Sequence, residues 1–318
     1  MTTRFTVKVP ATSANLGPGF DCMGIALNVF NEMTVEVGRP FSVRIEGESA
    51  SLLPADERNS VVQTIHRVFE RVGATNAPRE WALSLLNHIP VASGLGSSAT
   101  AIVGGILLAN AMLKRYEPER TMTRSEQFDF ATELEGHPDN VTPALQGGAC
   151  VVCIDDYGAQ TFPLPIPPNL HFVVATPYFM LPTEESRHVV PKQVSRADAV
   201  YNISQAARLV AALASGNLDW LRIGFGDRLH EPYRRPLIPG FDEVHRTAIR
   251  AGAVTTTLSG AGPSVLAWCD NDGTAWQVAD QITLTWREHN VPCRTEVYQV
   301  CTAETKVQVS EVDGSADL

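Results

Sequence analysis

The segment "PVASGLGSSATAIVGG", residues 90–105, constrains the fold most, because it joins a glycine turn directly to an apolar helix. Gly94 and Gly96 carry no Cβ and can adopt positive φ, so the backbone can turn tightly and approach a bound anion. The helix expected from about Ser97 offers free amide groups and the positive end of its dipole. On these residues alone, a phosphate-binding loop and a glycine turn before a serine-capped core helix are equally good interpretations.

Two common phosphate loops fit this segment poorly. A Walker A loop requires a lysine after its glycines, and none follows here. The letters "GLGSSA" match the dinucleotide pattern G-x-G-x-x-A, but a Rossmann unit also needs a second parallel strand that ends in an acidic residue. Glu117 stands in a polar linker that leads into another helix, so a nicotinamide dehydrogenase is a remote third hypothesis.

Composition narrows the class of protein. The chain has 318 residues, of which 44% are hydrophobic and 19% charged, as in ordinary globular proteins of one or two domains. Its formal net charge of −10, without any run of Lys or Arg, argues against nucleic acid or an acidic membrane surface as a partner. We therefore expect a protein that acts on small molecules.

Targeting and redox signals are weak. The N-terminus has no apolar signal segment, and the apolar stretch 99–113 contains polar residues and glycines, so we expect it to fall short of a membrane span. Six cysteines are scattered along the chain, and the pair Cys150 and Cys153 has no second pair to complete a zinc site. Buried thiols in a reducing cytoplasm are the expectation.

Hydrophobic periodicity predicts alternating strands and helices. Strands are expected at 5–9, where Pro10 ends the first, and at 33–37, 41–45, 81–85, 147–155, 170–177, 254–260, 264–269 and 294–300. Helices are expected at 60–72, from 97, at 123–135, and near 195–215, 241–251 and 273–288. The proline-rich segment 162–169 suggests a boundary between an N-terminal domain, 1–160, and a C-terminal domain, 161–318, and residues 310–318 are expected to fray.

Five segments together resemble one enzyme family, the GHMP kinases. "PVASGLGSSATA" resembles their ATP-binding motif, and "TTTLSGAGPSV" resembles their glycine-rich C-terminal motif. "VPATSANLGPGFDCMGIALN", "LEGHPDNVTPALQGG" and "LHEPYRRPLIPG" are similar to segments of the homoserine kinases within that family. The matches follow the family's order over residues 7–266. By itself the second glycine turn could approach a ligand or the first loop, or simply connect two core strands.

The resemblance implies a fold, a reaction and a location. The fold would be α+β, with an N-terminal domain like domain 2 of ribosomal protein S5 and a ferredoxin-like C-terminal domain. The reaction would be ATP-dependent phosphorylation of L-homoserine to O-phospho-L-homoserine in threonine biosynthesis. Homodimers are common in the family. A kinase for another small alcohol, or a GHMP-fold binding protein without catalysis, are the alternatives.

The resemblance also implies the residues around ATP. Asn59, whose position before an expected helix also suits an N-cap, would lie near the adenine. The loop around the triphosphate would comprise Pro90, Val91, Ala92, Ser93, Gly94, Leu95, Gly96, Ser97, Ser98, Ala99 and Thr100. Ser98 and Glu135 would hold Mg²⁺, which prefers hydroxyl and carboxylate oxygens. Glu133 is the alternative carboxylate, but the spacing in "EGHPDN" favours Glu135.

For the amino-acid substrate, the resemblance implies charged and polar contacts. These residues would be Asn15, Asp21, His137, Thr183, Arg187, Arg234 and Gly260. Asn15 and Asp21 would meet the ammonium and polar groups, and the two arginines would clamp the carboxylate. Asp139 and Asn140 would stand near the hydroxyl. Asp139 could take the hydroxyl proton, or positioning with Mg²⁺ could suffice for a loose phosphoryl-transfer transition state.

Overall fold

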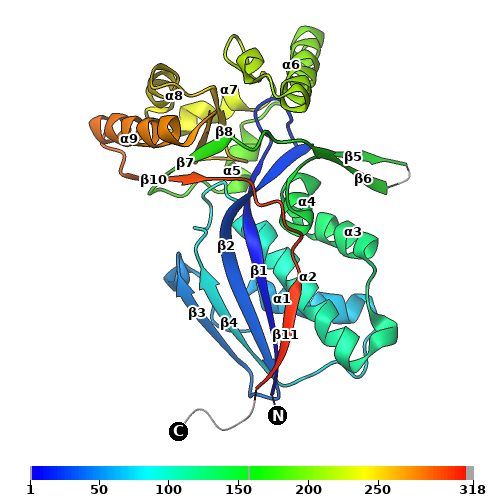
Figure 1. The fold of residues 1–318 in the computed structure, drawn as a ribbon. Coiled ribbons are helices and arrows are strands. Elements are labelled where there is room, and N and C mark those ends of the chain that lie inside the picture. Colours follow the sequence, from blue (N-terminus) through cyan, green and yellow to red (C-terminus); the bar gives the residue numbers. More distant parts are fainter. Residues whose placement is uncertain (1, 157, 313–318) are drawn as a thin grey trace.

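The computed structural model describes residues 2–156 and 158–312, which form two β-sheets at opposite ends of the molecule (Figure 1). The first sheet has seven strands in the order β11-β1-β2-β4-β3, and β5 extends it by pairing with β2 and β6. Its strand pairs are antiparallel except for β3 with β4. The strands are β1 (Thr2–Ala14), β2 (Met23–Val37), β3 (Ser42–Gly47), β4 (Trp81–Asn87), β5 (Ala149–Asp155), β6 (Gly158–Leu164) and β11 (Val307–Val312).

Four helices pack together against this sheet. They are α1 (Ser60–Arg71), α2 (Ser97–Tyr116), α3 (Arg124–Glu135) and α4 (Pro138–Gln146), with short 3-10 turns η1 (Ala50–Leu52) and η2 (Pro118–Arg120). Asn59 caps α1, because its side-chain oxygen accepts a hydrogen bond from the amide of Val61 at 3.0 Å. Helix α2 is central and contacts β1 and the other three helices.

By length and composition alone, α2 could cross a membrane, contrary to the expectation for residues 99–113. However, 67% of its most apolar window is buried within the protein. Its apolar residues Val103 and Ile106 belong to the core that also contains Phe5 and Trp81. The helix is therefore the central core helix of this half of the molecule.

The second sheet has four antiparallel strands in the order β10-β7-β9-β8. With helices after the first and third strands, this is the β-α-β-β-α-β arrangement of a ferredoxin-like fold. Helices α8 and α9 pack against each other and against this sheet. The elements are β7 (His171–Pro177), α5 (Thr183–His188), α6 (Arg196–Ser215), η3 (Leu218–Leu221), α7 (Glu231–Arg234), η4 (Arg235–Leu237), α8 (Phe241–Arg250), β8 (Thr255–Leu258), β9 (Val265–Cys269), α9 (Asp272–Glu288) and β10 (Cys293–Tyr298).

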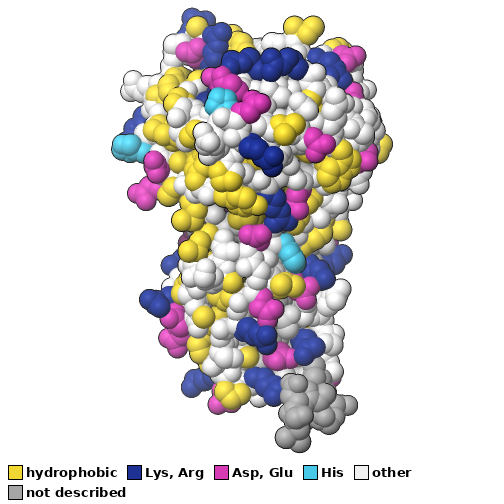
Figure 2. Space-filling model, turned by 90° about the vertical axis from the view of Figure 1, so that its left-hand side faces the viewer, with side chains coloured by type: hydrophobic (Ala, Val, Ile, Leu, Met, Phe, Trp, Pro, Cys, Tyr) yellow, Lys and Arg dark blue, Asp and Glu magenta, His cyan; other side chains and the backbone are white. Residues whose placement is uncertain are grey.

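One hydrophobic cluster joins the two halves. It contains Leu16 and Ile25 from the first half, Phe172 and Trp268 from the second sheet, and Leu209 from α6, all fully buried. Phe172 and Trp268 meet edge to face with ring centroids 5.1 Å apart. Figure 2 shows acidic and basic side chains interspersed over one face of the molecule, in agreement with the absence of a basic run in the sequence.

Most expected elements are present, and three expectations about where elements begin or end were wrong. The first strand continues past Pro10 to Ala14, because a register shift between Pro10 and Ala11 accommodates the missing amide. Pro138 starts the additional helix α4 rather than only ending α3, since proline is well suited to a first helical position.

The C-terminal region supplies the third correction. Residues 310–312, expected to fray, pair with β1 as the end of β11, and the remainder of that expected tail lies outside the described residues. Strand β6 crosses residue 160 and stays with the first sheet, to which β11 also returns. The division into 1–160 and 161–318 remains a prediction.

Candidate active site

The loop between β4 and α2 is shaped by positive φ angles. Gly94 and Gly96 have φ of 84° and 69°, and Ala92 is also left-handed at 51°. A Cβ on Gly96 would lie 2.0 Å from the hydroxyl oxygen of Thr12, so only glycine fits beside β1. Gly96 is the N-cap residue of α2 and brings no capping side chain, which leaves the first-turn amides of α2 available to an anion.

The second glycine turn supports this loop. A Cβ on Gly94 would lie 2.3 Å from the carbonyl oxygen of Ser259. The Ser259 hydroxyl donates to the Gly94 carbonyl at 2.7 Å, and the Ser264 amide donates to the Ser93 carbonyl at 3.2 Å. Of the interpretations left open for "TTTLSGAGPSV", the structure therefore shows a close approach to the first loop, and Gly260 also lines the cavity described next.

A polar cavity of about 90 Å³ opens in front of this loop, between the two halves of the molecule. Its lining combines loop residues with side chains from five other segments of the chain. It comprises Ala14, Asn15, Ala92, Ser93, Gly94, Gly96, Ser97, Ser98, Glu135, His137, Asp139, Asn140, Thr183, Arg187, Arg234, Gly260 and Ala261. The structure thus brings together most of the residues that the motifs indicated.

Ser98 and Glu135 are neighbours in this cavity. The Ser98 hydroxyl donates to a carboxylate oxygen of Glu135 at 2.8 Å. Burial raises the pKa of Glu135 more than this hydrogen bond lowers it. Glu133, by contrast, is exposed and forms an ion pair with Arg71 at 3.1 Å, outside the cavity lining.

The residues that follow α3 form a second pair. His137 Nδ1 donates to Asp139 Oδ1 at 2.6 Å, and the Asp139 side chain is 1% exposed. Although burial lowers the pKa of His137, the hydrogen bond and charge of Asp139 outweigh it and raise that pKa overall. Asn140 accepts a hydrogen bond from the Thr12 hydroxyl at 2.7 Å, which ties the start of α4 to β1.

Arg187 and Asp21 form an ion pair across the cavity edge. The guanidinium donates to the two carboxylate oxygens at 2.8 Å and 3.2 Å. Asp21 is held by the Asn15 side chain, which accepts from the Asp21 amide at 2.9 Å. Asn15 also donates to the Gly260 carbonyl at 2.8 Å. The predicted ammonium and carboxylate contacts of the substrate are therefore bonded to each other in this structure.

Arg234 is 1% exposed, and hydrogen bonds to three residues fix its guanidinium. It donates to the carbonyls of Ser186 and Gly260 and to His230 Nδ1 at 3.1–3.2 Å. His230 donates from Nε2 to the Gly17 carbonyl at 2.8 Å, so both of its ring nitrogens have a fixed hydrogen-bond partner. Burial lowers the pKa of Arg234 to about 10.

The anchor of Arg234 was not among the predicted site residues. His230 is fully buried, and Asp227 accepts hydrogen bonds from the amides of His230 and Glu231. The spacing of His230 and Arg234, four residues apart in "LHEPYR", is the sequence signal that could have identified it, because such residues share one helical face.

A second cavity of about 220 Å³ continues from the polar cavity and shares Ala92, Ser97 and Ser98 with it. Asn59 lies here, as do Val91 and Thr100. The other lining residues are Asn31, Met33, Leu53, Ser60, Val61, Leu85, Asn87 and Ala101. Its mainly apolar walls could accommodate a flat base beside the loop.

Four predicted loop or substrate residues lie elsewhere. Asp21 is outside the lining of the polar cavity but reaches it through Arg187. Pro90 and Leu95 line neither of the two cavities above but a third one, on the reverse of the loop. Ala99 is fully buried in the core behind the loop, so its side chain serves packing.

Comparisons with known proteins agree with this architecture. The family model for the N-terminal domain of GHMP kinases matches residues 59–148, and the model for their C-terminal domain matches residues 209–288. The chain belongs to the GHMP kinases. A homoserine kinase of Moorella thermoacetica is 43% identical over 295 residues, which are 93% of this chain and 97% of that protein. Within the GHMP kinases, the chain is therefore a member of the homoserine kinase family.

Further relatives support the same placement. A homoserine kinase of Carboxydothermus hydrogenoformans is 45% identical over 262 residues, which cover 82% of this chain and 84% of that protein. The crystal structure of homoserine kinase from Cytophaga hutchinsonii aligns with a TM-score of 0.83 and 31% identity, over 96% of this chain and 97% of that one. The mevalonate kinase of L. major, at 16% identity and a TM-score of 0.69, shares the fold.

Proposed function

We propose that this chain transfers the terminal phosphoryl group of ATP to the hydroxyl of L-homoserine and makes O-phospho-L-homoserine for threonine biosynthesis. The observation that carries the proposal is the polar cavity, where one phosphate loop meets a hydroxyl–carboxylate pair and two guanidinium groups. Phosphoryl transfer requires a held triphosphate, a compensated charge and an aligned acceptor. The names of the homoserine kinases described above supply the choice of acceptor.

The arrangement of the cavities supports a path for ATP. The base would occupy the cavity that contains Asn59, and the phosphates would follow the loop from Ala92 to Ser98 into the polar cavity. The first-turn amides of α2 would bind the phosphate oxygens, since that helix end carries positive potential. Gly94 and Gly96 let the backbone take this path, because side chains there would collide with Ser259 and Thr12.

We also propose that Ser98 and Glu135 hold Mg²⁺. Their oxygens lie 2.8 Å apart, and they are hard donors of the kind that this ion prefers. The described residues contain no cluster of three or more His, Cys, Asp or Glu side chains suited to a metal. A two-oxygen site suits magnesium, which commonly takes its remaining ligands from phosphates and water. When bound, the ion would offset negative charge on the phosphates.

The charged pair at the cavity edge suits a zwitterion. Homoserine carries an ammonium and a carboxylate, the same two charges that Arg187 and Asp21 now present to each other. The substrate would exchange with this pair, its ammonium toward Asp21 and its carboxylate toward Arg187. Arg234 donates to the Gly260 carbonyl and would present its fixed guanidinium to the substrate. Thr183 would line the remaining side of the polar cavity.

Asp139 is bonded to His137, which supports positioning rather than proton abstraction as its main role. Asn140 would align the hydroxyl from the neighbouring position, held by Thr12. A loose transition state requires little help from a base before the phosphoryl group has left ADP. A homodimer and a cytoplasmic location remain predictions that belong to this proposal, together with the prediction that neither nucleic acid nor membrane is a partner.

The test is a panel of acceptors. Purified protein with Mg-ATP is given L-homoserine, mevalonate or galactose, and ADP release is measured. Among the three alcohols, we expect only L-homoserine to cause ADP release. Turnover of another alcohol in its place would indicate a different GHMP kinase, and ATP binding without any alcohol-dependent ADP release would indicate a binding protein.

A further inference from the structure

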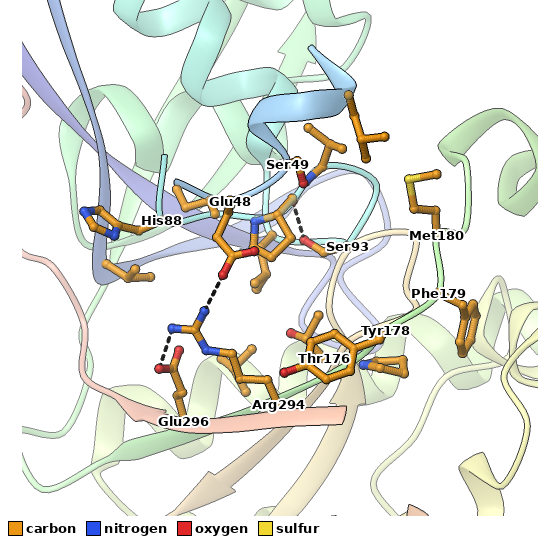
Figure 3. Close-up of a pocket in the computed structure, with 18 of the residues that line it drawn as sticks. Glu48, Ser49, His88, Ser93, Thr176, Tyr178, Phe179, Met180, Arg294 and Glu296 are labelled. Carbon is orange, nitrogen blue, oxygen red and sulfur yellow. Dashed lines mark hydrogen bonds and ion pairs between the residues drawn. The ribbon is translucent and has the colours of Figure 1, made fainter. Parts of the chain in front are cut away.

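A third cavity of about 270 Å³ lies on the reverse of the phosphate loop (Figure 3), and we call it the reverse cavity. Loop residues Pro90, Val91, Ser93 and Leu95 form one wall, whereas Ala92, Gly94 and Gly96 line the polar cavity. Strands β7 and β10 form the opposite wall. The reverse cavity lies between the two halves of the molecule and shares one lining residue with each of the other cavities, Ser93 with the polar cavity and Val91 with the cavity of Asn59.

Most of its lining is apolar. Leu52, Tyr178 and Met180 line it and remain 60%, 69% and 57% exposed. Figure 2 shows hydrophobic side chains gathered between the two halves on one face of the molecule. Apolar side chains that stay exposed together around a cavity commonly mark a binding site.

The polar end of the reverse cavity carries an unbalanced charge. Arg294 donates to Glu48 at 2.8 Å and to Glu296 at 2.6 Å, as Figure 3 shows. Two carboxylates thus share one guanidinium, which leaves this cluster with a net charge of minus one when all three are ionised. The Tyr298 hydroxyl also donates to Glu296. Since Glu48 is 40% exposed and Glu296 36%, both can still accept a further hydrogen bond.

We propose that the reverse cavity binds a small organic cation, namely an ammonium group on an apolar body. The ammonium would donate to Glu48 and Glu296, and the apolar body would lie against Leu52 and Met180. The ring of Tyr178 would add cation–π attraction near the mouth. An anion of the same shape would meet a guanidinium already occupied by two carboxylates. The proposal concerns a site apart from the phosphoryl-transfer cavity and does not depend on the proposed function.

The test compares two probes that carry opposite charges on the same phenylethyl skeleton, 2-phenylethylamine and 3-phenylpropionate. Binding to the full chain is followed by NMR of methyl-labelled methionine, with the Met180 signal assigned through Met180→Leu. We expect the amine to shift the Met180 signal and to bind at least about tenfold more tightly than the carboxylate, the effect of one charge-assisted hydrogen bond.

Glu48→Gln removes one carboxylate and should weaken binding of the amine about tenfold. Glu46→Gln is the matched control, because Glu46 lies on β3 two residues before Glu48 and pairs with Arg44 at the surface. Urea unfolding confirms that each variant is folded, and Glu296→Gln replaces Glu48→Gln if that variant is not. Equal binding of the two probes, an unchanged Met180 signal, or equal effects of both substitutions would overturn the proposal.

A third probe separates plain amines from amino acids. L-Phenylalanine offers a carboxylate to Arg294 in addition to its ammonium. Tighter binding than the amine, lost in Arg294→Gln, supports the site and identifies an amino acid as its ligand. Weaker binding than the amine supports the site with a plain amine as its ligand. We expect that ATP does not displace the amine from Met180, since the cavity of Asn59 shares only Val91 with the reverse cavity.

Discussion

The phosphate loop separates two cavities of opposite character. The polar cavity in front holds about 90 Å³ and is crossed by paired side chains, such as Ser98 with Glu135 and His137 with Asp139. The reverse cavity holds about 270 Å³ and is mostly apolar, with its charges confined to one end. The larger space is therefore not where phosphoryl transfer is expected. The donors that line a cavity, rather than its volume, indicate its chemistry.

The loop lines both cavities and is held by hydrogen bonds on both sides. On the reverse side, the Val91 amide donates to the Ser49 hydroxyl at 3.2 Å. On the side of the second glycine turn, Ser259 and Ser264 bond to Gly94 and Ser93. Substitutions in front of the loop, in the loop and behind it should therefore differ in kind as well as in size.

The largest effect is expected in front of the loop, at Glu135. Glu135→Gln should lower kcat about a thousandfold, because the proposed magnesium site loses its only carboxylate. Glu133→Gln is the matched control and should change kcat less than about twofold, since its surface ion pair contributes little. Steady-state assays with homoserine and Mg-ATP measure both. A larger loss for Glu133→Gln would assign the metal to the other carboxylate.

The next effect concerns the loop. Gly94→Ala places a Cβ 2.3 Å from the Ser259 carbonyl at a φ of 84°, so we expect a loss of about 3 kcal/mol in the free energy of unfolding. Gly216→Ala, at a φ of 72° with nothing within 4 Å, should lose only about 1 kcal/mol. Urea titrations compare the two. Equal losses in the free energy of unfolding would show that the contact with the second glycine turn does not restrict the side chain at position 94.

A smaller effect is expected at Asp139. Asp139→Asn should lower kcat between about tenfold and a hundredfold and leave measurable turnover, because an amide can still accept from His137. Single-turnover assays with saturating homoserine measure the chemical step. Complete loss of turnover, with intact folding and substrate binding, would identify Asp139 as a true general base.

Local patterns predicted much of the fold. The amphipathic spacing of α1, α8 and α9 and the alternation in β4 were sufficient, because each pattern reports a face that packs on a core. Helix α4 was missed because Pro138 can end one helix or begin another, and only the packing of α4 on β1 and β2 decides. Strand β11 was missed because its partner, β1, lies at the other end of the chain.

Local patterns also predicted the candidate site only in part. Motifs placed Ser98, Glu135 and Arg187 in one site, and the polar cavity contains all three. They did not predict that Arg187 would pair with Asp21, 166 positions away, or that His230 would hold Arg234. Such pairings depend on how the two halves of the molecule meet, which local spacing does not encode.

The smallest effect is a pH dependence of stability at His137. The pKa of His137 is raised in the folded protein, so its contribution to stability is fully present below the unfolded pKa of 6.5 and is lost as pH rises through the folded pKa. The free energy of unfolding of the wild type, minus that of His137→Gln, should therefore fall between pH 6 and pH 9, by on the order of 1 kcal/mol. Urea titrations across that range measure it, and the subtraction cancels the other titrating groups. A difference that grows with pH would mean that burial, rather than Asp139, dominates the charge of His137, and the paired side chains in front of the loop would then be less tightly coupled than their distances indicate.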